Sequence, residues 1–341
     1  MAAAPILQVE NLYTQFANET GTVRSVDGIS FTLHAGETLG IVGESGSGKT
    51  VTSLSIMGLI ENPGRIAGGK VHYLDQELQD KPRVEMDRLR GREISMVFQD
   101  SLSSLNPTMK VGQQIGRVLR DHTDLGPRQR KARVVELLRE MNIPEPAKRA
   151  GSYPHEMSGG MRQRVLIAMA IACNPKVLIL DEPTTALDVT IEAQIFELIE
   201  RLQREHQMGT ILITHDLSVV AHACDRVLIM YAGRVVEEAP AETLYADPLH
   251  PYTLGLLQSI PSSDHPPRSH LPSIPGEVPD MAWLPQGCSF APRCRFATEA
   301  CRRADPALRA FGREHRAACI RVEEIHDPVQ NDRVRGTRAT G

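Results

Sequence analysis

The sequence contains no long hydrophobic run. Its longest apolar stretch, Val165–Cys173, has nine residues, and a membrane-spanning helix needs roughly 18–20. The first residues, Met1–Pro5, include neither the basic segment nor the apolar core of a secretory signal. We therefore expect a chain that stays in the cytosol.

Basic residues are not in excess either. Lys and Arg number 38 against 42 Asp and Glu, which gives a formal net charge of −4. A nucleic-acid-binding domain more often carries a clear basic excess, so this class of function is disfavoured. The hydrophobic fraction of 41% is ordinary for a globular protein, and 341 residues suffice for two domains or for one large domain with an appendage.

One glycine-rich stretch carries a specific pattern. Residues 43–50 read GESGSGKT, between an apolar run at 38–42 that predicts a buried strand and residues 51–57, which open a helix. Glycines let backbone N–H groups turn towards phosphate oxygens, and the helix start adds further donors. In this pattern Lys49 reaches the β- and γ-phosphates and the Thr50 hydroxyl ligates Mg²⁺, so we expect a nucleoside triphosphate to bind here. The loop residues assigned to the nucleotide are Gly43, Ser45, Gly46, Ser47, Gly48, Lys49 and Thr50.

Two carboxylates end a second buried strand. Residues 177–180 are consecutively apolar, which is typical of a strand buried on both faces, and Asp181 and Glu182 follow at once. Asp181 suits Mg²⁺ binding beside a phosphate loop. Glu182 suits polarising a water molecule for attack on the γ-phosphate.

Two further polar residues follow expected strands. Gln99 comes directly after residues 94–98, and His215 after residues 211–214. In open α/β sheets, ligands bind at the carboxyl ends of the strands. We therefore expect Gln99 to contact Mg²⁺ or the attacking water, and His215 to contact the γ-phosphate.

A second anion-binding device lies at Ser158-Gly159-Gly160. Ser158 is a favourable N-cap, and the two glycines leave backbone N–H groups accessible at the start of a helix. Asp188 opens another expected helix, at 189–206.

The N-terminal region predicts a separate sheet. Residues 6–33 alternate apolar and polar side chains with a turn near Asn18–Gly21, which indicates antiparallel strands. Phe16 ends the first strand, and its ring either stacks on a nucleotide base or packs on the sheet. Residues 101–156 are expected to be mostly helical, with periodic apolar residues at 111–120 and 128–141.

Four of the six cysteines gather in the C-terminal part of the chain. After about residue 255 the composition shifts, and residues 260–285 are rich in Pro and Ser, as in an extended linker. The cysteines that follow are separated by five, six and seventeen residues. In a cytosolic chain such clustering indicates a four-thiolate metal site, with either zinc or an iron–sulfur cluster. The predicted ligands are Cys288, Cys294, Cys301 and Cys319, whereas Cys173 and Cys224 are expected in the core.

These motifs, in this order, resemble the ATP-binding cassette family of transporter ATPases over about residues 6–255. The resemblance implies an α/β phosphate-loop fold with an N-terminal antiparallel β subdomain and a helical subdomain at about 101–172. It also implies that two cassettes pair head to tail, so that each ATP lies between the phosphate loop of one and the Ser-Gly-Gly signature of the other. Carried over by position, the family's roles fall on Phe16 (base stacking), Gln99 (Q-loop), Ser158, Gly159 and Gly160 (signature), Asp181 (Walker B), Glu182 (catalytic base), Asp188 (D-loop) and His215 (switch histidine).

A finer resemblance is carried by residues 43–49, 153–164 and 250–253, which look like the D-type ATPase subunit of oligopeptide and dipeptide importers. It implies a nucleotide-binding domain at 1–255 and a C-terminal extension with the four-Cys motif at 256–341. It also implies an ATP-hydrolysing subunit, peripheral to the cytoplasmic face of the inner membrane, with ATP, Mg²⁺ and a [4Fe–4S] cluster as cofactors and zinc as the alternative metal. The implied partners are an F-type ATPase subunit, two transmembrane permease subunits and an extracytoplasmic peptide-binding protein, with no nucleic acid.

Two alternative functions stay open. Nickel importers share this branch, so the cargo could be nickel or another small solute. Cassette ATPases that act on nucleic acid or ribosomes usually carry two cassettes or a long inserted coiled coil, and this chain has one cassette and no such insertion.

Overall fold

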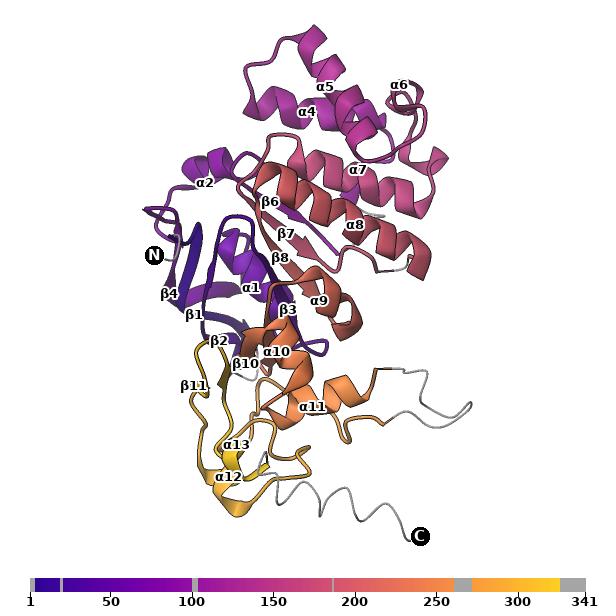
Figure 1. The fold of residues 1–341 in the computed structure, drawn as a ribbon. Coiled ribbons are helices and arrows are strands. Elements are labelled where there is room, and N and C mark those ends of the chain that lie inside the picture. Colours follow the sequence, from indigo (N-terminus) through magenta and orange to yellow (C-terminus); the bar gives the residue numbers. More distant parts are fainter. Residues whose placement is uncertain (1–3, 19–20, 100–103, 186, 261–271, 326–341) are drawn as a thin grey trace.

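The computed structural model describes residues 4–18, 21–99, 104–185, 187–260 and 272–325 (Figure 1). The first residues of the expected helical subdomain, 101–103, and the end of the expected extension, 326–341, lie outside the described residues.

A parallel sheet forms the centre of the molecule. Five neighbouring strands run parallel, in the order β9-β3-β8-β7-β6. Their apolar sequences agree with this position, since β3, β7 and β8 are buried at every residue, as strands covered on both faces must be. The strands are β3 (Thr38–Val42), β6 (Ile94–Val97), β7 (Val177–Asp181), β8 (Gly209–Thr214) and β9 (Arg226–Tyr231). Helices α1 (Lys49–Ile56), α2 (Arg83–Leu89) and α9 (Leu217–Ala223) connect parts of this layer.

The N-terminal region forms the predicted antiparallel sheet. Its strand order is β2-β1-β4-β5, and alternating burial along β2 places one face of the sheet against the core. The sheet packs on α1, where the Thr14 and Ser55 hydroxyls lie 2.7 Å apart. Its strands are β1 (Leu7–Asn18), β2 (Gly21–Leu33), β4 (Gly64–Tyr73) and β5 (Gln76–Glu77).

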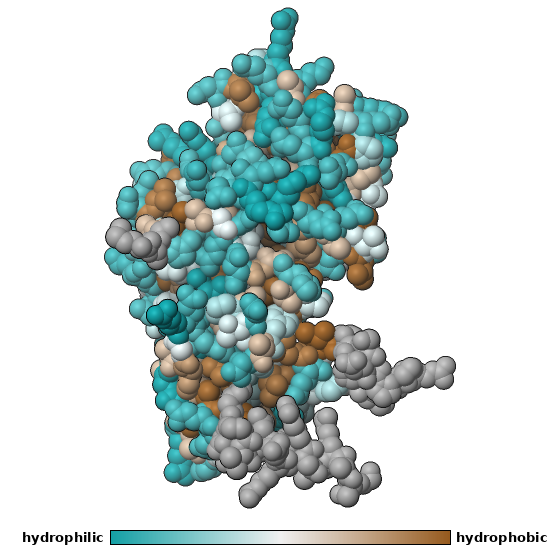
Figure 2. Space-filling view, viewed as in Figure 1, coloured by the Kyte–Doolittle hydropathy of each residue, from teal (hydrophilic) through white to brown (hydrophobic). Residues whose placement is uncertain are grey.

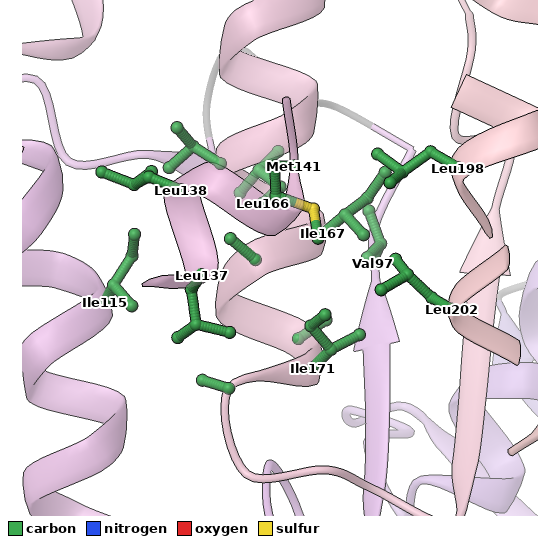
Figure 3. Close-up of a cluster of buried hydrophobic side chains, with 14 of the residues drawn as sticks. Val97, Ile115, Leu137, Leu138, Met141, Leu166, Ile167, Ile171, Leu198 and Leu202 are labelled. Atoms are coloured by element: carbon green, nitrogen blue, oxygen red, sulfur yellow. The ribbon is translucent and has the colours of Figure 1, made fainter. Parts of the chain in front are cut away.

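A helical subdomain lies at the opposite side of the parallel sheet from the C-terminal extension (Figure 1). Apolar side chains from its helices meet those of β6 and α8 in one buried cluster, in which Ile115, Leu137 and Ile167 are fully buried (Figure 3). This shared core fixes the subdomain on the edge strand. The helices of the subdomain are α4 (Val111–His122), α5 (Pro127–Glu140), α6 (Pro146–Arg149), the short 3₁₀ helix η1 (Pro154–Glu156) and α7 (Gly159–Ile171). Helix α8 (Val189–His206), which follows β7, packs against them.

The C-terminal extension adds strands to the central sheet. Strand β12 pairs antiparallel with β10, which itself pairs with β9, so the sheet has eight strands. The predicted boundary between residues 255 and 256 falls inside α11, and the division into two domains stays a prediction. The elements from β10 onwards are β10 (Arg234–Pro240), α10 (Ala241–Ala246), α11 (Pro251–Gln258), α12 (Glu299–Arg303), β11 (Arg309–Ala310), β12 (Arg316–Ala317) and α13 (Val322–Ile325).

A buried carboxylate anchors the extension. Glu237 of β10 is fully buried and accepts hydrogen bonds from the backbone N–H groups of Leu249 (2.6 Å) and His250 (2.9 Å). Its Oε1 also lies 2.8 Å from Nε2 of His315. Each carboxylate oxygen is thereby satisfied, as burial of a charge requires.

Among the described residues, no helix combines the length and the apolar character needed to cross a bilayer. Hydrophilic side chains cover most of the face seen in Figure 2, and hydrophobic ones gather towards its lower part, where the extension begins.

Candidate active site

The phosphate loop joins β3 to α1 and can be built only with glycine at two positions. Gly48 is the N-cap of α1 with a φ of 99°, and an added Cβ there would lie 2.2 Å from the Ser25 carbonyl oxygen. At Gly43, an added Cβ would lie 2.2 Å from the carbonyl oxygen of Met230 on β9. The loop is thus pressed against its own scaffold, with its shape fixed by close backbone contacts.

Lys49 lies inside this loop. Its ammonium group donates to the carbonyl oxygens of Gly43 (2.7 Å) and Glu44 (2.9 Å). Burial lowers the pKa of Lys49, while the charges of Glu182 and Asp181 act in the opposite direction. The buried hydroxyl of Ser47 makes no hydrogen bond within the described part of the chain. A buried cation beside an unpaired hydroxyl fits phosphate oxygens.

Thr50 and Asp181 form the expected pair of oxygen donors. The Thr50 hydroxyl donates to Oδ1 of Asp181 at 3.2 Å, and Asp181 is buried at the end of β7. Burial raises the pKa of Asp181 to about 6, although the Thr50 hydrogen bond lowers it. Mg²⁺ in nucleotide sites is held by one or two protein oxygens together with phosphate oxygens, so this pair fits the ion.

Glu182 brings three strand ends together. Its Oε2 accepts a hydrogen bond from the side-chain amide of Gln99 (2.9 Å), and its Oε1 lies 3.2 Å from Nδ1 of His215. The three residues come from the ends of β6, β7 and β8, as the sequence predicts. The Thr185 hydroxyl also donates to Oε2 (3.1 Å), a contact that the sequence does not signal. The Gln99 amide group donates its hydrogen bond to Glu182. A contact between Gln99 and Mg²⁺ stays a prediction.

The Ser-Gly-Gly segment starts α7. The Ser158 hydroxyl oxygen accepts a hydrogen bond from the backbone N–H of Met161 (3.3 Å), so it caps the helix as predicted. Asp188 caps α8 in the same way, through the N–H of Ile191 (3.0 Å). Ser158 and Asp188 are exposed. Among the described residues, no hydrogen bond joins 158–160 to the phosphate loop.

Phe16 lies in a groove beside α1. Its ring lines a groove of about 920 Å³ together with Leu54, Ile60 and Phe98, and none of the lining residues belongs to 43–50. It also packs on Gly64, where an added Cβ would lie 2.4 Å from the ring. Base stacking by Phe16 stays a prediction, and this packing accounts for the aromatic ring without a nucleotide.

Two residues of the C-terminal part contact the phosphate loop and were missed from the sequence. Arg293 donates to both carboxylate oxygens of Glu44, at 2.6 and 3.0 Å. The backbone N–H of Glu44 donates to the Tyr252 hydroxyl oxygen at 2.9 Å. Since 249 positions separate Glu44 from Arg293, no local pattern could have indicated this contact.

The predicted iron–sulfur cluster is wrong. Among the residues that the structure describes, which include Cys288, Cys294, Cys301 and Cys319, no group of three or more Cys, His, Asp or Glu is placed to hold a metal ion. The four cysteines are free and line one cavity of about 20 Å³, which is room for about one water molecule. Burial raises the pKa of the Cys319 thiol to about 11, so this thiol is protonated at neutral pH in the described arrangement. The zinc alternative has no support on the same ground.

The sheet topology and this site define an ATPase of the ATP-binding cassette class. The family model described as ABC transporter matches residues 26–185. A dimeric ATP-binding cassette in a post-hydrolysis state, bound to ADP and phosphate, is similar in structure, with a TM-score of 0.63 and 26% identity. The match covers 69% of this chain and 98% of that one.

The branch of the family follows from the C-terminal region and from close relatives. Residues 236–301 match the model described as oligopeptide/dipeptide transporter, C-terminal region. The oligopeptide transport ATP-binding protein OppD of Haemophilus influenzae is 50% identical, over 90% of this chain and 94% of that protein. OppD of Salmonella typhimurium is 49% identical, over 94% and 95%. The chain belongs to this family of oligopeptide/dipeptide transporter ATPases.

Proposed function

We propose that this chain hydrolyses ATP to power the import of dipeptides or oligopeptides across the cytoplasmic membrane. The observation that carries the proposal is the extension that matches the oligopeptide/dipeptide transporter region at residues 236–301. Cassettes serve many cargoes, so the cassette alone supports ATP hydrolysis and leaves the cargo open. The OppD relatives are named for oligopeptide transport.

The phosphates of ATP would lie against the loop 43–50, with Lys49 as the cation. Mg²⁺ would be held by Thr50, Asp181 and Gln99, and it would neutralise negative charge on the phosphates. The Thr50–Asp181 hydrogen bond, at 3.2 Å, supports this assignment because it places two of these oxygen donors side by side.

Glu182 is proposed as the base that takes a proton from the attacking water. A carboxylate with three polar neighbours is held in one orientation, which general-base catalysis requires. Gln99 and His215 would position Glu182 and sense the γ-phosphate, and their contacts with the carboxylate support that role.

The Ser-Gly-Gly segment is proposed to complete the ATP site of a second cassette. Ser158 and Asp188 are exposed, and the helix N-terminus at Gly159–Gly160 suits binding of a phosphate from another subunit. The dimeric form of the similar cassette structure supports pairing. We propose an F-type ATPase subunit as the partner, so that the working unit is a heterodimer.

The assembly would include two transmembrane permease subunits and an extracytoplasmic peptide-binding protein. The chain itself would be peripheral, on the cytoplasmic face of the membrane. Its nucleotide-binding domain would span residues 1–255 and its extension residues 256–341.

Uptake into proteoliposomes that contain the reconstituted assembly tests the cargo. We expect ATP-dependent uptake of a radiolabelled dipeptide. Uptake of radiolabelled Ni²⁺ without dipeptide uptake would contradict the peptide assignment and leave the ATPase assignment intact. Purification of the chain with RNA, and without membrane subunits, would contradict transport altogether.

A further inference from the structure

The phosphate loop contains an acid, and the C-terminal extension neutralises it. Glu44 is the second residue of the loop, and its backbone carbonyl accepts a hydrogen bond from Lys49. Arg293 contacts both oxygens of its carboxylate, at 2.6 and 3.0 Å. The Arg293 side chain is only 6% exposed, against 28% for Glu44. A buried, two-pronged arginine–carboxylate pair is a strong and geometrically specific contact.

Other contacts fix Arg293 in this position. Its Nε donates to the carbonyl oxygen of Pro275 (3.0 Å), and its guanidinium lies 5.9 Å from the centre of the Tyr231 ring. The Tyr231 ring packs edge-on against Tyr252 and Phe290. The arginine is therefore held before any ligand binds, so little side-chain freedom remains to be lost.

Tyr252 holds the same residue of the loop from its backbone. Its fully buried ring presents a hydroxyl that accepts the hydrogen bond of the Glu44 N–H (2.9 Å). Both the side chain and the backbone of Glu44 are thus fixed by residues that follow β10 in the sequence.

The charge of Glu44 bears on nucleotide binding. It lies close enough to Lys49 to act on the pKa of that ammonium group, together with Glu182 and Asp181. An unpaired carboxylate at this place would repel the phosphates that the loop has to bind. The pairing with Arg293 removes most of that repulsion.

We propose that Arg293 is a positioning residue that acts on ATP through Glu44: by neutralising this carboxylate, the C-terminal extension sets the affinity of the phosphate loop for ATP. A structural change in the extension that withdraws Arg293 weakens ATP binding without touching the nucleotide. The proposal depends on the ATPase assignment and is independent of the cargo.

The first experiment measures binding of a fluorescent ATP analogue to the full-length chain. Arg293→Ala is expected to raise the Kd about tenfold, since truncating one partner of a buried charge pair leaves the other unpaired. The matched control is Arg295→Ala, two positions away in the extension, whose exposed guanidinium lies over Phe296 and makes no contact with the loop. The control should leave the Kd within about twofold of the unmodified value.

The second measurement is the kinetics of ATP hydrolysis by the reconstituted assembly. Arg293→Ala should raise KM for ATP and leave kcat unchanged, whereas a loss of folded protein would lower kcat at constant KM.

A second variant separates neutralisation from folding. Glu44→Gln removes the charge and keeps the shape, so it should bind the analogue as tightly as the unmodified chain, or more tightly. Added to Arg293→Ala, it should restore the Kd to within about twofold of the unmodified value. If Glu44→Gln alone weakens binding tenfold, or if Arg293→Ala weakens it equally with and without Glu44→Gln, the proposal is wrong. If the Arg293→Ala variant does not fold, the Kd of the Glu44→Gln variant alone tests the proposal.

Discussion

Glu182 lies in a backbone conformation that few side chains adopt. Its φ is 46°, in the left-handed region, where a residue other than glycine costs on the order of 1–3 kcal/mol. The neighbouring strand offsets this cost, because the Glu182 N–H donates to the carbonyl oxygen of Ile213 (2.9 Å). The strained turn directs the carboxylate to Gln99 and His215. Strain held in place by its surroundings is typical of a functional residue.

At the residue scale, we predict that Glu182→Gln abolishes most ATP hydrolysis and preserves ATP binding. The amide keeps the shape but cannot take a proton, and loss of a general base costs about 10²–10⁴ in rate. Phosphate release by the assembly and analogue binding by the chain are the two measurements.

The control for this variant is Glu192→Gln. Glu192 is a nearby acid on α8 whose carboxylate accepts a hydrogen bond from Thr184 (2.6 Å). Its backbone N–H donates to the Asp188 carbonyl oxygen (2.9 Å), a contact that replacing the side chain leaves in place. Turnover of the control should stay within about twofold of the unmodified assembly. Equal turnover in the Glu182→Gln and unmodified assemblies would remove Glu182 from the proposed role.

The site residues divide by how local their signals are. Gln99, Glu182 and His215 could be predicted because each lies within two residues of the end of an apolar run, and parallel strands bring their carboxyl ends to one edge. The contact of Arg293 could not be predicted, since its partner is distant in sequence and no local pattern marks the contact.

The metal site predicted from the cysteines was wrong for a different reason. Their proximity in sequence does translate into a shared cavity, but the cavity is too small for a metal cluster. Cys288 and Cys294 pack instead against the apolar cluster that contains Phe290.

Among the elements, α7 and α8 depend on close packing at their N-termini. An added Cβ at Gly160 would lie 2.7 Å from Cγ2 of Ile191, whereas at Gly159 the nearest atom, Cδ2 of Leu187, is 3.4 Å away. Ile191 is branched at Cβ and stiff, so it cannot move aside cheaply. The two adjacent glycines therefore meet different steric demands.

We predict that Gly160→Ala lowers the free energy of unfolding by about 1–3 kcal/mol, the usual cost of overpacking. Gly159→Ala should be neutral or stabilising by up to about 1 kcal/mol, because alanine restricts the unfolded chain and fits a helix. Urea unfolding of the two full-length variants measures both values. Equal changes in the free energy of unfolding for the two variants would show that the contact with Ile191 does not determine the cost of alanine at position 160.

Element boundaries followed the strength of their local patterns. The predicted helix at 189–206 agrees with α8 to the residue, because an N-cap and a 3.6-residue period mark it. Helix α2 and the two-residue strands β11 and β12 were not predicted. Strand β12 pairs with β10, and β11 pairs in turn with β12. Strands this short depend on the partner that they pair with, and their own sequence does not indicate that partner.

For the whole molecule, the extension is integrated with the cassette through buried polar contacts. Glu237 binds the chain at Leu249 and His250 and lies against His315 of the extension. His250 is also the N-cap of α11, since its Nδ1 accepts a hydrogen bond from the Tyr252 N–H (3.1 Å). Through its side-chain hydroxyl, Tyr252 also contacts Glu44 of the phosphate loop. Stability of this junction and geometry of the nucleotide site are thus connected through α11.

Burial lowers the pKa of His250 from 6.5 to about 4, against the opposing charge of Glu237. Below pH 6.5 the unfolded chain takes up a proton that the folded chain excludes, so folding is weakened as the pH falls towards 4. This residue alone should account for a loss on the order of 3 kcal/mol in the free energy of unfolding.

Asparagine can keep the N-cap but cannot titrate, so His250→Asn should flatten the decline in the free energy of unfolding between pH 6.5 and 4. Urea unfolding across this range measures the slope, with His222→Gln, an exposed histidine on α9, as the control that should keep it. A slope unchanged by His250→Asn would mean that His250 does not set the response of this junction to acid.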